Sequence, residues 1–133
     1  MTRKEAREQA FVLIFEKEIS KLDTADILAN AAEARDVITN DFSLTLFEGV
    51  FAHLEEIDGQ IAARLQGWRP ERLSKVVLAL LRLCVFELRY LEDVPASVSI
   101  NEAVELCKKY ATEEDTAYLN GVLGSIARAA EQK

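Results

Sequence analysis

The sequence predicts an all-α protein, and three observations support this. Apolar residues recur at steps of three and four along most of the chain, which is the spacing of one helix face. Turn residues are scarce, with 5 Gly and 2 Pro in 133 residues, whereas a β-sandwich needs a turn roughly every 8–12 residues. Two Ser/Thr-x-x-Glu capping boxes each precede an apolar segment of helical spacing.

The first half of the chain is expected to hold three helices. Thr2 and Glu5 form a capping box, which predicts a helix over about residues 3–18. A short helix is expected to follow Asp23. The third helix is expected to be long, over about residues 40–66, because its apolar stripe continues for six turns. That stripe consists of Phe42, Leu46, Val50, Leu54, Ile57, Ile61 and Leu65.

The second half is also expected to hold three helices. The segment 73–92 is apolar nearly all round, so it is expected to be the central, buried helix. The Asp-Val-Pro sequence at 93–95 ends it, and Ser99 and Glu102 form a second capping box that predicts the start of the next helix. Thr112 is followed by three acidic residues, a pattern typical of a helix start.

The segment Gly67-Trp68-Arg69-Pro70 is the best candidate for a boundary between these halves. We therefore expect two packed three-helix subdomains, an N-terminal one over 1–67 and a C-terminal one over 68–133. The net charge of −7 argues against broad, nonspecific binding to nucleic acid. Any RNA or DNA site must then be a local basic patch on an acidic protein.

No catalytic or metal-binding constellation is recognisable, so the sequence predicts neither an enzyme nor a cofactor. His53 is the only histidine, and a metal site needs three or four ligands. Cys84 and Cys107 are expected to be buried small hydrophobes in a reducing compartment. No apolar leader follows Met1, and the apolar run 76–86 is too short for a membrane span. We expect a cytoplasmic protein that does not enter a membrane.

A candidate binding patch lies in the first helix. Arg3, Lys4 and Arg7 fall within an arc of roughly 100° on a helical projection, where they could contact phosphates. The alternative is an ordinary solvated face on which Glu8 pairs with Lys4. A second basic cluster, Lys108-Lys109-Tyr110, ends a predicted helix, where cations are favoured for structural reasons alone.

Several segments of the chain resemble one family. These segments are, in chain order, RKEARE at 3–8, LRLCVFEL at 81–88, DVP at 93–95, INEAVEL at 100–106 and NGVL at 120–123. In this order and spacing they closely resemble the NusB family of bacterial transcription antitermination factors. The resemblance extends over the whole chain.

The resemblance implies a NusB-like helical bundle that binds boxA RNA in the leaders of ribosomal RNA operons. It implies a protein partner, NusE, which is also a ribosomal small-subunit protein. The pair would join RNA polymerase and other Nus factors and suppress premature termination. A single-stranded boxA leaves bases free to be read by a small patch. The alternative function is a helical protein–protein scaffold or homodimer with weak or no RNA binding.

The resemblance also implies roles for individual residues. Arg82 matches a family arginine, which would contact phosphate or form a structural pair with Glu87 or a neighbouring helix. Tyr118 matches a family aromatic residue, which would stack on a base or pack a corner between helices. The residues that match the arginine-rich N-terminal segment are the main RNA-binding candidates: Arg3, Lys4 and Arg7.

Two further features depart from expectation. Val77 and Leu78 occupy places where relatives often carry an acidic–basic pair. Either this position is more buried here, or it forms an apolar interface for a partner or a second copy. Gly121 and Gly124 each cost a helix about 1 kcal/mol relative to Ala, which predicts a close helix–helix approach at these glycines.

Overall fold

The computed structural model describes residues 1–35, 40–65, 67 and 69–131. This part of the chain contains helices and no strand, which confirms the all-α prediction. The elements in order are α1 (Arg3–Ser20), α2 (Thr24–Arg35), α3 (Asp41–Ala52), α4 (Leu54–Ala62), the 3₁₀ helix η1 (Pro70–Arg72), α5 (Lys75–Tyr90), α6 (Ala96–Tyr110) and α7 (Glu113–Glu131).

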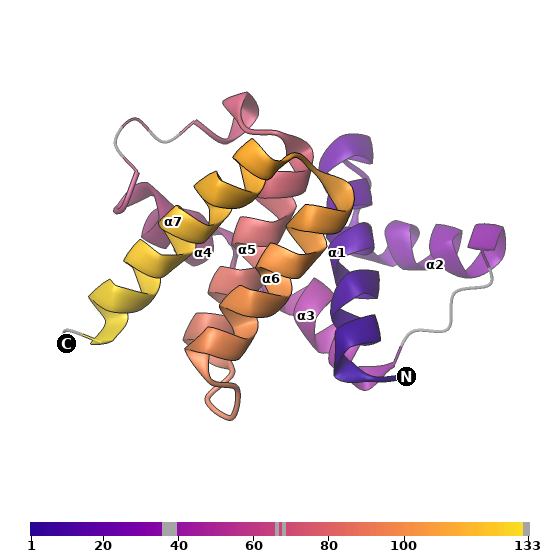
Figure 1. Cartoon of the computed structure of the whole chain (residues 1–133). Helices are drawn as coiled ribbons and strands as arrows, with labels where there is room; N and C mark the ends of the chain where they lie inside the picture. Colours follow the sequence, from indigo (N-terminus) through magenta and orange to yellow (C-terminus); the bar gives the residue numbers. More distant parts are fainter. Residues whose placement is uncertain (36–39, 66, 68, 132–133) are drawn as a thin grey trace.

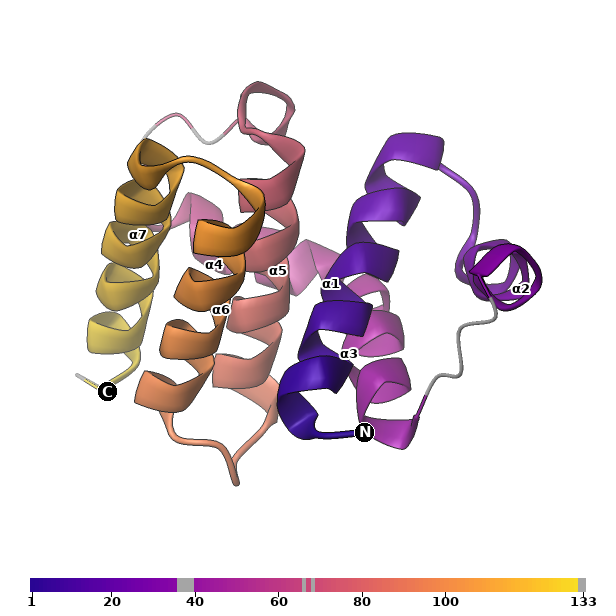
Figure 2. The ribbon, with the colours of Figure 1, turned by 45° about the vertical axis from the view of Figure 1, so that its right-hand side comes forward.

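Helix α5 is the centre of the molecule, as its composition predicts. It contacts α1, α3, α4, α6 and α7, and every residue from Val77 to Glu87 is buried. Helices α5, α6 and α7 lie side by side, while α1 and α3 pack together beside them and α2 is outermost (Figures 1 and 2). One cluster of buried apolar side chains runs through both groups of helices. The helices therefore share a single core.

Three helix starts follow the sequence prediction. Thr2 Oγ1 accepts a hydrogen bond from the amide of Glu5 at 3.1 Å, and the Glu5 carboxylate accepts one from the Thr2 amide at 3.0 Å. This is the predicted capping box. Asp23 and Thr112 each accept a hydrogen bond from the amide three residues further on, at 2.9 and 3.0 Å. These side chains satisfy amides that the first helical turn leaves without partners.

The prediction of one long helix over 40–66 is wrong. The structure has two helices, α3 and α4, which meet at His53 (φ −117°, ψ 22°). The His53 amide still donates to the Gly49 carbonyl, and its own carbonyl accepts from Ile57, so the break loses few hydrogen bonds. The apolar stripe continues across it, and periodicity alone could not reveal it.

The predicted capping box at Ser99 is also wrong. Helix α6 begins three residues earlier, at Ala96, directly after Pro95. Proline is favoured at a helix start because it has no amide hydrogen to satisfy and its φ angle is already helical. Ser99 lies in the first turn, where its hydroxyl donates to Glu87 Oε1 at 2.9 Å.

The close helix approach occurs at a different glycine from those expected. A Cβ atom at Gly121 would meet nothing within 4 Å, and one at Gly124 would meet only the Arg128 guanidinium. At Gly49, in contrast, a Cβ atom would lie 2.3 Å from Cζ of Phe86. The packing of α3 on α5 therefore requires glycine at position 49.

A buried ion pair joins α1 to α5. Arg7 Nε lies 3.0 Å from both carboxylate oxygens of Glu87, and the two side chains are 6% and 2% exposed. The Ser99 hydroxyl adds a hydrogen bond from α6 to the same carboxylate. A buried charge is tolerated only when it is paired and hydrogen-bonded, so these three groups must come together when the protein folds.

A second network joins α5 to α4 and α1. Arg82 donates from Nε and Nη2 to the two oxygens of Asp58, at 3.0 and 2.9 Å, and from Nη1 to Glu18 at 3.1 Å. Partial burial raises the pKa of Glu18, but the hydrogen bond from Lys21 and the charge of Arg82 together lower this pKa by more than burial raises it. The net pKa of Glu18 is below its ordinary value, so the network favours the ionised carboxylate.

We predict that Gly49→Ala destabilises the protein although alanine is the better helix former. The added methyl group overlaps the Phe86 ring, and overpacking of this kind costs about 1–3 kcal/mol. Gly59→Ala in α4 is the matched control, because its Cβ atom would meet nothing within 4 Å. Thermal unfolding should show a lower Tm for the first variant and an unchanged or higher Tm for the second. A Tm that rises in both would contradict the packing argument.

Glu87→Gln should destabilise the protein by about 3 kcal/mol, because it leaves the Arg7 guanidinium buried without a counter-charge. Urea unfolding at neutral pH measures this loss. The control is Asp93→Asn, which breaks the exposed pair with Arg3 and should change stability by less than about 1 kcal/mol. Equal effects of the two substitutions would contradict the structural role of the buried pair.

Glu18→Gln should make stability less dependent on pH. A carboxyl whose pKa is lowered on folding contributes stability above its unfolded pKa of about 4.3, and that contribution disappears as the pH falls through the folded pKa. The variant should be less stable than the parent at about pH 7, and the difference should shrink at about pH 3. Urea unfolding at both pH values tests this, with the exposed Glu92→Gln as control. A constant difference would contradict it.

Candidate nucleic-acid interface

The first turn of α1 presents two exposed cationic side chains, Arg3 and Lys4. The Arg3 guanidinium lies 4.4 Å from the centre of the Phe42 ring and 3.4 Å from Asp93, and its side chain remains 54% exposed. An exposed ion pair of this length contributes little to stability. The Arg3 guanidinium can therefore turn to a phosphate at little cost to the stability of the fold.

Arg7 and Arg82, the other two arginines among the RNA-binding candidates, form ion pairs inside the fold. Arg7 lies in the buried pair with Glu87, and Arg82 lies in the network with Asp58 and Glu18. For Arg82, the sequence left open a phosphate contact or a structural pair, and the structure has the pair, with partners on α4 and α1. The side chains of Arg7 and Arg82 are each 6% exposed, so of the three cations expected on α1 only Arg3 and Lys4 lie at the surface.

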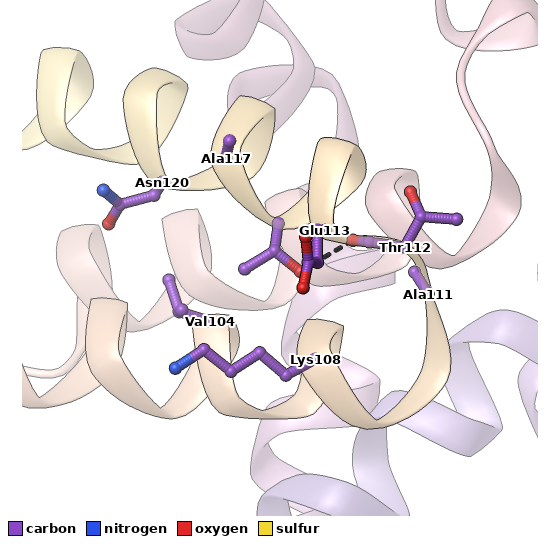
Figure 3. A pocket seen from close by; sticks show the side chains of 8 residues that line it. Val104, Lys108, Ala111, Thr112, Glu113, Ala117 and Asn120 are labelled. Carbon is purple, nitrogen blue, oxygen red and sulfur yellow. Dashed lines mark hydrogen bonds between the residues drawn. The ribbon is translucent and has the colours of Figure 1, made fainter.

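Tyr118 is exposed on α7, where its ring is available for stacking. A groove of about 600 Å³ lies between α6 and α7 (Figure 3). Val104 and Ala117 form apolar parts of its wall, and Lys108 and Asn120 add polar groups. The groove places hydrogen-bonding groups next to an apolar surface. It is lined by Val104, Lys108, Ala111, Thr112, Glu113, Thr116, Ala117 and Asn120.

A three-residue cluster joins α1 to the end of α6. Lys109 Nζ donates to Oε2 of Glu8 at 2.5 Å, and the Tyr110 hydroxyl donates to the same oxygen. The Tyr110 ring packs on Phe11 with 5.1 Å between ring centres. The sequence suggested Lys4 as the partner of Glu8, because the contact with α6 spans about a hundred residues and leaves no local pattern.

The cluster shifts the pKa values of its members. Hydrogen bonds from Lys109 and Tyr110 hold the pKa of Glu8 below its ordinary value, and the charge of Lys4 adds to this. The hydrogen bond to Glu8 raises the pKa of Lys109 and also that of Tyr110. At neutral pH the cluster is therefore a carboxylate held between a protonated amine and a neutral phenol.

Val77 and Leu78 do not form a surface patch. Their side chains are 2% and 0% exposed, in the core around α5. Of the two explanations that the sequence left open, burial is the one found in the structure. Both residues lie where the chain packs against itself, so they offer no surface to a partner or a second copy.

The described residues contain no group of three or more His, Cys, Asp or Glu side chains that could hold a metal ion. His53 packs on Tyr90, with 4.2 Å between the ring centres. Cys84 and Cys107 are free and buried, and burial raises the pKa of both thiols. Among the described helices, none is long and apolar enough to cross a membrane.

Comparisons with known proteins agree with this fold. The model of the NusB family matches residues 4–128. The transcription antitermination protein NusB of Listeria monocytogenes is 43% identical over 127 residues, which cover 96% of this chain and 97% of that protein.

Solved structures give the same result. NusB of T. maritima superposes with a TM-score of 0.85 at 30% identity, covering 96% of this chain and 92% of that one. A structure of the antitermination factors NusB and NusE in complex with dsRNA superposes with a TM-score of 0.84 at 30% identity, covering 96% of each chain. The match of sequence and fold over nearly the whole length shows that this chain belongs to the NusB family.

Proposed function

We propose that this protein binds boxA RNA in the leaders of ribosomal RNA operons together with NusE. With RNA polymerase and other Nus factors, the complex would suppress premature termination. The protein would act in the cytoplasm by binding, without catalysis and without a cofactor. Support comes from relatives described as antitermination proteins, and from a relative crystallised with NusE and RNA.

The observation that carries the proposal is the pair of exposed cations on the first turn of α1. Arg3 and Lys4 project from a chain whose net charge is −7, so they form the kind of local basic patch that an acidic RNA-binding protein needs. Tyr118 provides an exposed ring, and stacking on such a ring is how unpaired bases are commonly held. The remaining positive charge would come from NusE.

For the alternative function, a scaffold or homodimer with weak or no RNA binding, the sequence offered Val77 and Leu78 as one candidate interface. These residues are buried, so that support is absent. RNA binding therefore remains the function that the surface favours.

We predict that Arg3→Ala with Lys4→Ala weakens boxA binding about tenfold at low salt and makes its salt dependence shallower. Each phosphate contact to a single strand contributes about 0.7 to the slope of log K against log salt, so two lost contacts remove about 1.4. Fluorescence anisotropy of a labelled boxA RNA at two salt concentrations, with and without NusE, measures both quantities. Arg7 is left intact because its substitution would disturb the buried pair with Glu87.

The matched control is Arg69→Ala with Arg72→Ala, which removes the same charge from exposed residues at η1. Equal weakening by both double substitutions would mean that net charge matters and the α1 patch does not. A scrambled RNA that binds as tightly as boxA, even with NusE, would overturn the proposed specificity. Tighter binding of a boxA duplex would contradict recognition of the single strand.

A further inference from the structure

We propose that Lys109 and Tyr110 form a binding site for one RNA phosphate, and that Glu8 occupies this site in the free protein. This inference rests on the proposed RNA-binding function and adds a contact to it. The Glu8 carboxylate would stand in for the phosphate and would be displaced when RNA binds.

The geometry resembles that of a bound anion. Two donors from the end of α6, the Lys109 ammonium and the Tyr110 hydroxyl, converge on the same carboxylate oxygen of Glu8. Lys4 lies one helical turn before Glu8, and its charge stabilises that carboxylate. Three groups that favour a negative charge therefore surround one position, and a phosphate oxygen has the charge and acceptor geometry to take it.

The donors do not depend on Glu8 for their placement. The Tyr110 ring packs on the buried ring of Phe11, and Lys109 Nζ lies 5.4 Å from the centre of the Tyr110 ring. Removal of the carboxylate would leave the phenol on its apolar support. The site would then remain formed, with an unpaired cation at its edge.

The carboxylate can be displaced because the pair is open to water. The side chain of Glu8 is 30% exposed and that of Lys109 is 60% exposed. Ion pairs in such positions are weak and screened by salt. A polyanion that releases counterions on binding can therefore compete with Glu8, at the cost of a few-fold in affinity.

The position of the site fits an RNA path along α1. Arg3 and Lys4 occupy the first turn of that helix, and Glu8 lies one turn further on, where the end of α6 meets it. A strand that contacts the first turn can reach Lys109 without crossing an intervening helix. The site would raise the number of cationic contacts to RNA from two to three.

The test compares Glu8→Gln with Glu105→Gln, using fluorescent boxA RNA and a scrambled control at two salt concentrations. Both variants change the net charge by the same amount, and Glu105 pairs with Lys108, the neighbour of Lys109. We expect Glu8→Gln to tighten RNA binding about two- to fivefold at low salt and to steepen the salt slope by about 0.7. Glu105→Gln should change the affinity less than twofold.

A second pair of variants tests the donors. In a Lys109→Gln background, Glu8→Gln should no longer tighten binding, because the cation that Glu8 neutralises is absent. Tyr110→Phe keeps the ring on Phe11 but removes the hydroxyl, and it should weaken RNA binding about two- to threefold. Circular dichroism melts of each variant verify that the fold is retained.

Equal tightening by Glu8→Gln and Glu105→Gln would overturn the inference, as would tightening that persists without Lys109. If Glu8→Gln tightened the binding of NusE but not of RNA, the inference would also be overturned, and the site would be a contact for a protein carboxylate. A phosphate contact does not depend on base sequence, so the experiment can reject the phosphate site without rejecting boxA recognition, and the reverse. Loss of the preference for boxA over scrambled RNA overturns the proposed function, whereas the difference between the two variants on either RNA decides the phosphate site.

Discussion

The buried pair between Arg7 and Glu87 sets the position of α1 against the rest of the molecule. Glu87 lies on the central helix, and Ser99 of α6 shares its carboxylate, so three helices must meet at one point. Successive residues of a helix are separated by about 100°, so the inward position of Arg7 also determines which way its neighbours face. Glu8, the residue after Arg7, meets the end of α6, whereas Arg3 and Lys4 share the arc of Arg7 but lie in the first turn of α1, where they stay exposed. The buried pair therefore fixes α1, which carries the proposed RNA-binding residues, against the central helix.

The sequence predicted the helical class, the central position of 73–92 and several helix starts, because these depend on local chemistry. The Thr2–Glu5 capping box is an example, since its partners are three residues apart. The break at His53 could not be predicted, because the apolar spacing continues across it. The start of α6 differs from the prediction because Ser99 and Glu102 have the spacing of a capping box, although the helix begins directly after Pro95.

The candidate site was predictable only in part, because side-chain partners far apart in sequence leave no pattern. Arg3, Lys4 and Arg7 are equivalent on a helical projection, yet Arg7 finds a carboxylate 80 residues away and the other two remain exposed. The resemblance to a family indicates that an arginine belongs at position 82, but it does not indicate the role of that arginine. A phosphate contact and an ion pair would both explain it. The buried environment of Arg82 decides between them, and that environment is a property of the folded chain.

Burial of the two thiols has a consequence for chemical durability. The thiolate is the form of cysteine that reacts with oxidants, and the raised pKa values of Cys84 and Cys107 keep both residues in the thiol form at neutral pH. Cys84 lies on α5, where an oxidant can reach it only after the central helix separates from its neighbours. The rate of oxidative damage at this residue is therefore limited by how often the core opens. Tight packing protects the protein against oxidants as well as against unfolding.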